Sequence, residues 1–157
     1  MKLCDLLEVD KISLDIEADS KEQVITSLIS LFKDDQRVVD LEYLKKAVFD
    51  REKIMSTGVG MGFAIPHAKT NAVSDVIAAF ARSKTPIDFQ SLDNKPVDIF
   101  FLLVGTEAQV GLHIKLLSRI SRLMNRDGFR EKLSSAKNST EIRKLFCDEE
   151  SHFFEIS

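Results

Sequence analysis

The chain of 157 residues has few of the residues that mark several specialised protein classes. It contains no tryptophan, six glycines and three prolines, which excludes collagen-like and glycine- or proline-rich low-complexity sequences. Two cysteines are too few for a disulfide-rich scaffold. No stretch approaches the roughly 18 consecutive apolar residues of a membrane-spanning helix, so no membrane insertion is expected.

An excess of one charge sign is also lacking. The 22 Lys and Arg residues face 25 Asp and Glu residues, which leaves a formal net charge of −3. This near balance argues against a nucleic-acid partner, because such proteins usually carry a basic excess. Apolar residues make up 44% of the chain, as in folded globular proteins. The length fits one domain, which we place at residues 1–148, followed by an acidic and aromatic tail at 149–157 that is either frayed or docked through its phenylalanines.

The two cysteines, Cys4 and Cys147, stand near opposite ends of the sequence and belong to no Cys-x-x-Cys motif or Cys/His cluster. We expect them to be reduced, as in an intracellular protein, while a long-range disulfide between them stays open. Asp5 and Glu8 lie where a secretory signal peptide has its apolar run. The sequence therefore predicts a cytoplasmic location.

Hydrophobic periodicity predicts strands and helices in a mixed order. Alternating apolar residues indicate a strand at 12–16, and the apolar runs 76–81 and 97–104 are typical of buried strands. Capping residues and helical periodicity predict helices that begin after Ser20, Asp40, 111, 126 and 137 and end near 32, Arg51, 124, 135 and 147. This order predicts a single-domain α/β fold in which helices flank a mixed β-sheet.

Residues 51–70 are the most unusual part of the sequence. Glycines at positions 58, 60 and 62 alternate there with large apolar residues. We interpret this run as one extended strand with a bulky buried face and a nearly bare opposite face. Pro66 would end the strand because it lacks a backbone N–H, and His67 is then expected on the loop just beyond.

The glycine pattern alone leaves two interpretations open. It is not followed by Gly-Lys-Ser/Thr, so it is no Walker A loop, and its Gly-x-Gly-x-Gly spacing without an evident helix argues against a dinucleotide site. Glycine within a strand indicates either a close approach to the backbone or a bend. On composition alone, a bulged, twisted strand with only a structural role is as well supported as a segment with a chemical role.

The segment resembles the phosphorylation-site signature of the type-2 enzyme IIA domains of the bacterial phosphoenolpyruvate-dependent phosphotransferase system, in its mannitol, fructose and nitrogen-regulatory branch. The matching residues are Arg51-Glu52, Ser56-Thr57-Gly58, Gly60, Gly62 and Ala64-Ile65-Pro66-His67. The resemblance continues in family order through Thr85-Pro86-Ile87, Asp93-Asn94-Lys95-Pro96-Val97-Asp98 and Leu112-His113-Ile114-Lys115-Leu116-Leu117. It implies the mannitol-type enzyme IIA fold. Met61 and Ala68 depart from the family pattern, and each is expected to influence the shape of the site and the choice of partner.

The resemblance implies that His67 accepts a phosphoryl group at Nε2 while a hydrogen bond to its other ring nitrogen fixes the tautomer. A neutral imidazole is nucleophilic near neutral pH, and its phosphoramidate stays labile enough to transfer again. His113, beside the phosphorylated residue, is implied to hydrogen-bond the phosphoryl oxygens, and Arg51 to steady their charge. Ser56 and Thr57 either add donors to this binding site or only shape the turn.

Each of these residues also has an ordinary structural interpretation. His67 alone would be a surface histidine in a turn, and His113 a core residue at the start of a helix. Arg51 would complement the dipole of the helix that it ends. The remaining histidine, His152, lies in the tail and matches no motif.

No metal or other cofactor is predicted. No two histidines have ligand spacing such as His-x3-His, and neither cysteine has such spacing to a histidine. Phosphoryl transfer between protein histidines needs neither, because positioning and charge stabilisation suffice. A basic stripe runs along the later helices, and we interpret it as a solvated face, with acidic partners or RNA as alternatives. It consists of Lys115, Arg119, Arg122, Arg126 and Arg130.

The resemblance thus predicts a phosphoryl carrier, a phosphotransferase component whose partners are phospho-HPr or its nitrogen-branch homologue and then a IIB domain or a regulatory target protein. A free-standing chain favours the nitrogen-regulatory branch, and fructose- or mannitol-specific sugar transport is the alternative. A regulatory binding module that is not phosphorylated is a third possibility, of another class. A weak homodimer is compatible with all three.

Overall fold

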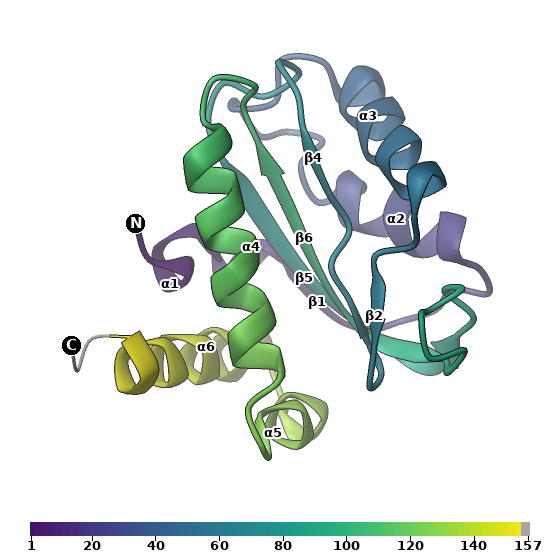
Figure 1. Cartoon of the computed structure of the whole chain (residues 1–157), viewed down its shortest axis with the longest axis vertical. Helices are drawn as coiled ribbons and strands as arrows, with labels where there is room; N and C mark the ends of the chain where they lie inside the picture. Colours follow the sequence, from purple (N-terminus) through teal and green to yellow (C-terminus); the bar gives the residue numbers. More distant parts are fainter. Residues whose placement is uncertain (155–157) are drawn as a thin grey trace.

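The computed structural model describes residues 1–154, and side chains through residue 152. Within these residues a six-stranded mixed sheet lies between two groups of helices (Figure 1). Its strands are β1 (Ile12–Ile16), β2 (Gly58–Gly60), β3 (Phe63–Ala64), β4 (His67–Lys69), β5 (Ile77–Ile87) and β6 (Val97–Gly105). They run in the order β1-β5-β6-β3-β2, with β4 also pairing with β6. The pairs β5–β6 and β2–β3 are antiparallel and the others parallel, which confirms the predicted mixed sheet.

The helices cover both faces of this sheet. They are α1 (Leu3–Leu6), the 3-10 turn η1 (Val9–Lys11), α2 (Lys21–Ser30), α3 (Leu41–Ile54), α4 (Val110–Met124), α5 (Phe129–Ser135) and α6 (Ser139–Phe154). In Figure 1, α2 and α3 lie on one side of the sheet and α4, α5 and α6 on the other. None of the helices in residues 1–154 combines the length and apolar character that crossing a bilayer requires.

Strand β6 shows why the central strands are almost continuously apolar. Ile99, Phe101 and Leu103 pack into the core beneath α4, α5 and α6, whereas Phe100, Leu102 and Val104 pack beneath α2 and α3. Successive side chains of a strand point to opposite faces, so a strand covered on both faces needs apolar residues at every position. The apolar run 97–104 is thus a buried strand, as predicted.

Two of the predicted helix starts, after Ser20 and Asp40, are confirmed by their capping bonds. Ser20 Oγ accepts a hydrogen bond from Gln23 N at 3.2 Å, and Asp40 Oδ1 accepts one from Tyr43 N at 3.1 Å. These bonds satisfy backbone N–H groups that a first helical turn leaves without partners. Helix α3 continues past Arg51 to Ile54.

The glycine-rich segment is a hairpin, so the prediction of one extended strand was wrong. Gly58–Gly60 and Phe63–Ala64 form antiparallel arms, and the chain reverses at Met61 and Gly62, whose φ angles are 58° and 87°. Val59 and Met61 are exposed rather than buried. Alternation with period two looks the same in one strand and in two arms of a hairpin, and the left-handed turn leaves no separate signal in such a run.

One of the two roles considered for these glycines is present at Gly58. A Cβ atom at this position would lie 2.5 Å from Ser91 Oγ, so the two backbone segments can approach only because a side chain is missing. His67, expected on a loop, instead opens β4 and pairs with Leu103 of β6. Strand β3 ends at Ala64, before Pro66, and the chain resumes its pairing with β6 directly after the proline, in β4.

The expectation of reduced cysteines was wrong. Cys4 in α1 and Cys147 in α6 form a disulfide, with Cα atoms 4.9 Å apart. Helix α1 is too short to produce a periodic pattern, and its docking onto α6 joins residues far apart in sequence. Among the two options for these cysteines, the structure has the long-range disulfide.

Helix α6 also extends beyond its predicted end at 147. The buried carboxylate of Glu150 accepts hydrogen bonds from Leu3 N and Cys4 N at 2.7 and 3.0 Å and pairs with Arg119. The first part of the predicted 149–157 tail is therefore helical and anchored. The predicted docking of its phenylalanines lies outside the described side chains.

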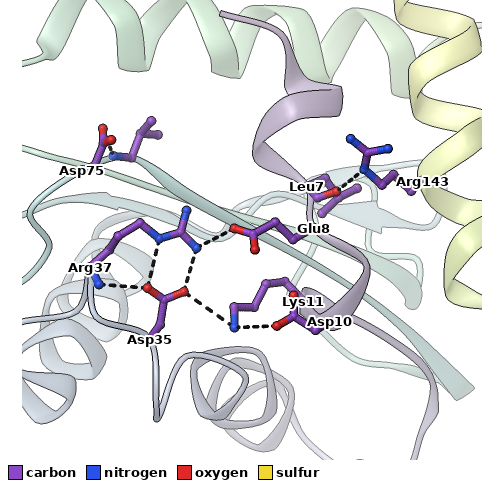
Figure 2. A network of polar contacts seen from close by, with 9 residues as sticks. Leu7, Glu8, Asp10, Lys11, Asp35, Arg37, Asp75 and Arg143 are labelled. Carbon is purple, nitrogen blue, oxygen red and sulfur yellow. Dashed lines mark hydrogen bonds and ion pairs between the residues drawn. The ribbon is translucent and has the colours of Figure 1, made fainter.

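A polar network fixes the segment before β1 to the loop after α2 (Figure 2). The Asp35 carboxylate accepts hydrogen bonds from Arg37 and pairs with Lys11, and Arg37 also pairs with Glu8. The hydrogen bond from Arg37 holds the pKa of Asp35 well below its usual range. Because the carbonyl of Arg37 accepts Ser74 N at 2.8 Å, the same loop also anchors the chain that follows β4.

Candidate functional site

A cavity of about 480 Å³ opens between α3, β4 and the first turns of α4. Three residues singled out by the sequence, Arg51, His67 and His113, line it together although they come from three different elements. The other lining residues are Asp50, Ile54, Ala68, Lys69, Ile114 and Leu117. Two imidazoles and two cations in one cavity form a site suited to an anion.

The hydrogen bond of His67 determines which ring nitrogen is available for chemistry. Nδ1 lies 2.8 Å from the carbonyl oxygen of Ile65. A carbonyl only accepts hydrogen bonds, so Nδ1 carries the proton and the neutral ring has its lone pair on Nε2. Burial lowers the pKa of His67, and the charges of Arg51 and Lys69 act in the same direction. The ring is therefore neutral, and nucleophilic at Nε2, at neutral pH.

His113 is the second imidazole of the cavity. It lies in the first turns of α4, and its ring centroid is 5.7 Å from that of His67. The residue is only 3% exposed, and neither ring nitrogen has a hydrogen-bond partner within residues 1–154. Burial, followed by the charges of His67 and Lys69, lowers its pKa to about 4. A buried polar group without a partner costs about 1–3 kcal/mol, so a group in the cavity that hydrogen-bonds this ring would be stabilising.

Arg51 lies near the C-terminal end of α3. Its Nη1 donates a hydrogen bond of 2.9 Å to the carbonyl oxygen of Met55, which follows the helix. This contact orients the guanidinium at the rim of the cavity, and its planar group has further donors for an anion. The position combines helix-end charge complementarity with a place in the site, so the two interpretations of Arg51 do not exclude each other.

Lys69 is a cavity residue that the sequence reasoning missed. It stands two positions after His67 in β4, which places both side chains on the same face of the strand. Its positive charge contributes to the lowered pKa of both histidines. Period-two spacing would have pointed to Lys69 if a strand had been predicted to start at His67.

Ser56 and Thr57 do not line the cavity of the histidines. Ser56 Oγ donates to the carbonyl oxygen of Phe89 at 2.7 Å, and the residue borders a different cavity. Thr57 is buried, and its N and Oγ1 both donate to the carboxylate of Glu52, at 2.9 and 2.6 Å. In this structure both residues shape the turn after α3.

Apolar side chains surround the mouth of the cavity. Ile54 and Ile114, which line it from α3 and α4, are 80% and 61% exposed, and neighbouring Met55 is 59% exposed. Exposed apolar groups around a polar site are typical of surfaces that bind another protein. The site thus combines a cavity lined by two imidazoles with an apolar rim.

The other residues considered from the sequence lie outside this cavity. Within the basic stripe, Arg119 pairs with Glu150, Arg126 pairs with Glu149, and Arg130 donates to the carbonyl of Met124. These contacts stabilise the packing of α4 to α6. His152 is exposed on α6. Within residues 1–154, no three His, Cys, Asp or Glu side chains are grouped so that they could hold a metal ion.

Comparison with known proteins identifies the family. Residues 5–148 match the profile of the family described as phosphoenolpyruvate-dependent sugar phosphotransferase system, EIIA 2. The chain is 38% identical over 142 residues to the fructose-specific EIIABC component of Bacillus subtilis (strain 168), covering 90% of this chain but only 22% of that longer protein. It is 37% identical to the fructose-specific EIIA component of Haloferax volcanii, covering 89% of this chain and 91% of the relative. It is 34% identical to a nitrogen regulatory protein of Bradyrhizobium diazoefficiens, covering 94% and 95%.

Solved structures agree with this assignment. The crystal structure of the nitrogen regulatory protein IIA-Ntr from Neisseria meningitidis superposes with a TM-score of 0.87 at 30% identity, covering 92% of this chain and 98% of that one. Mannitol enzyme IIA from Escherichia coli, solved in complex with phosphorylated enzyme IIB, shares the fold with a TM-score of 0.77 at 19% identity, covering 91% and 99%. The chain therefore belongs to the type-2 enzyme IIA family of the phosphoenolpyruvate-dependent sugar phosphotransferase system.

Proposed function

We propose that this chain is a phosphoryl carrier whose acceptor is Nε2 of His67. The donor is the phosphohistidine of HPr or of its nitrogen-branch homologue. The Nε2 lone pair attacks phosphorus in line, a new P–N bond forms, and the P–N bond to the donor imidazole breaks. The reverse chemistry, directed at a histidine or cysteine of the next protein, empties the carrier.

The observation that carries this proposal is the state of His113. Its two buried ring nitrogens have no hydrogen-bond partner among residues 1–154, and the ring stands beside that of His67. A phosphoryl group on His67 would supply oxygens for a ring that donates one hydrogen bond in its neutral form. Arg51 and Lys69 would offset the charge of the same oxygens.

The apolar rim supports transfer between proteins rather than the binding of a free small molecule. Ile54 and Ile114 would be covered when a partner docks, which also removes water from the reacting atoms. The mannitol enzyme IIA that shares this fold was solved bound to phosphorylated enzyme IIB. We accordingly propose docking at this rim for both the donor and a downstream IIB domain or regulatory target.

Intact mass after incubation with phosphoenolpyruvate, enzyme I and HPr tests the carrier function. We expect one acid-labile phosphoryl group per chain, and active partner proteins that leave the mass unchanged would refute the carrier and favour a binding module that is not phosphorylated. Fructose-specific EIIA and nitrogen regulatory proteins are both similar to this chain, so a second step has to distinguish the two branches. In that step a IIB domain of the fructose system is added to the phosphorylated protein. Rapid loss of the label to IIB indicates sugar transport, and retention of the label favours the nitrogen-regulatory branch.

The lowered pKa values predict an unusual pH dependence of transfer. Attack requires neutral His67, and its pKa lies below the ordinary histidine value of 6.5. The rate should therefore still exceed half of its maximum at pH 6.5 and fall below half only at lower pH, as the ring gains a proton. Initial rates across this pH range, together with an NMR titration of His67, measure the effect. A rate already halved at pH 6.5 would contradict the prediction.

Replacing Gly105 by alanine should slow phosphoryl transfer because it displaces the ring of His113. A Cβ atom there would lie 3.0 Å from His113 Nδ1, so the imidazole has to shift. Misplacement by a fraction of an ångström should slow transfer by about 3- to 10-fold, since about 1 Å costs about 10². The control is Gly111→Ala in the same helix as His113, because nothing lies within 4 Å of its new Cβ atom. Equal rates for the two variants would contradict a role for His113 in transfer.

A further inference from the structure

A buried carboxylate next to the site is not accounted for by the chemistry above. Glu52 follows Arg51 in α3, and its side chain is only 5% exposed. Its two oxygens receive Thr57 N at 2.9 Å, Thr57 Oγ1 at 2.6 Å and Lys21 Nζ at 2.7 Å. Burial of a carboxylate is costly unless it is paired, and three donors from two segments satisfy this one.

The bonds that Glu52 accepts fix the turn on which the nucleophile depends. The carbonyl oxygen of Thr57 accepts Ile65 N at 3.0 Å, and the carbonyl oxygen of Ile65 is 2.8 Å from His67 Nδ1. A continuous chain of hydrogen bonds thus connects the Glu52 carboxylate to the imidazole. Displacement of Thr57 would move the acceptor that holds the His67 proton on Nδ1.

The same turn also holds the cation of the site. Arg51 Nη1 donates to the carbonyl of Met55, two residues before Thr57. Lys21 completes the support from α2, since its ammonium pairs with Glu52 and lies 4.8 Å from the centre of the Phe89 ring. Neither Glu52 nor Lys21 lines the cavity of the histidines, so both act from behind it.

We propose that Glu52 is a positioning residue that, through Thr57, keeps His67 in its Nδ1-protonated tautomer and Arg51 at the cavity rim, with Lys21 as its counter-ion. This inference rests on the proposed carrier function for its kinetic consequence only. The tautomer of His67 is a property of the protein without any partner. The two consequences are therefore measured separately.

The experiment compares wild-type protein with Glu52→Ala and the near-isosteric Glu52→Gln. In Glu52→Ala we expect the maximal rate of phosphoryl transfer from phospho-HPr to fall by about 10- to 100-fold, the effect of a misplacement on the order of 1 Å. The KM for phospho-HPr should change by less than about twofold, because the apolar rim stays in place. Glu52→Gln keeps an oxygen for Thr57 N and should recover part of the rate.

Nitrogen-15 chemical shifts of the His67 ring supply the readout that a purely structural role would not move. Wild-type protein should show the Nδ1–H tautomer alone, and folded Glu52→Ala a mixture of both tautomers. The control is Glu22→Ala, which removes an exposed carboxylate of α2. Glu22 borders the second cavity, which Ser56 and Glu52 also border, and its loss should change neither rate nor tautomer.

Wild-type rate and tautomer in folded Glu52→Ala would overturn the inference. If Glu52→Ala does not fold, wild-type rate and tautomer in both of the single variants Glu52→Gln and Thr57→Val would overturn it. If wild-type protein itself accepts no phosphoryl group, the carrier function fails. The tautomer comparison still decides the role of Glu52 in that case.

Discussion

The His67→Ala variant is expected to gain no phosphoryl group from phosphoenolpyruvate, enzyme I and HPr, whereas the wild-type protein gains one. The substitution removes the atom that forms the P–N bond, so the effect is a complete loss rather than a slower rate. We do not expect His113 to replace it, because that ring lines the cavity but is only 3% exposed, which leaves little room for a partner to reach it. Intact mass at neutral pH, before and after acid treatment, measures the result.

The matched control for this variant is His152→Ala. His152 is exposed on α6. If accessibility alone decided which histidine is phosphorylated, His152 would be labelled. We expect His152→Ala to be labelled at the wild-type rate. Label that persists in His67→Ala and disappears in His152→Ala would place the chemistry outside the cavity and refute the site.

Replacement of Arg51 by alanine is expected to slow transfer by about 10²–10³-fold, the usual cost of removing one group that stabilises charge in a transition state. The guanidinium lies at the rim of the cavity, held by the Met55 carbonyl, where it would face the phosphoryl group that passes from the imidazole of HPr to His67 in the proposed transfer. Arg51→Lys keeps the charge but not the planar pair of donors, so its rate should lie between those of alanine and wild type. Rapid-quench measurement of single-turnover transfer from phospho-HPr gives these rates.

Lys53→Ala is the control for a general effect of charge. Lys53 is an exposed cation in the same last turn of α3. It borders the second cavity, which Ser56 also borders, and not the cavity that His67 and His113 line. Its removal should change the rate by less than about twofold, because exposed charges are screened by salt. If Lys53→Ala and Arg51→Ala slow transfer equally, Arg51 acts through long-range attraction of the partner instead of contact with the phosphoryl group.

Local signals explain which parts of the fold were predictable. Ser20 and Asp40 precede regular apolar periodicity, and both cap helices as predicted. The apolar run of β6 is long enough to identify a buried strand in the absence of any tertiary information. At Met61, by contrast, the chain reverses inside an alternating run, and the pattern contains nothing that separates a hairpin from a strand.

Long-range contacts explain the rest. The disulfide depends on the docking of a four-residue helix, α1, which is too short for a periodic signal. Resemblance to a family pointed to His67, His113 and Arg51, and the structure places all three at one cavity. Lys69 and Glu52 were assigned no role, because one depends on the start of β4 and the other on a bond network across three segments.

The position of His67 in β4 affects how other proteins would distinguish its phosphorylated form from its unphosphorylated form. The backbone of this residue is held in the ladder with β6, so its main chain has little freedom to rearrange. A phosphoryl group here would reverse the electrostatic potential at the cavity mouth and leave the shape of the surface almost unchanged. Proteins that discriminate between the two forms would then do so by sign of charge, and their selectivity would weaken as ionic strength rises.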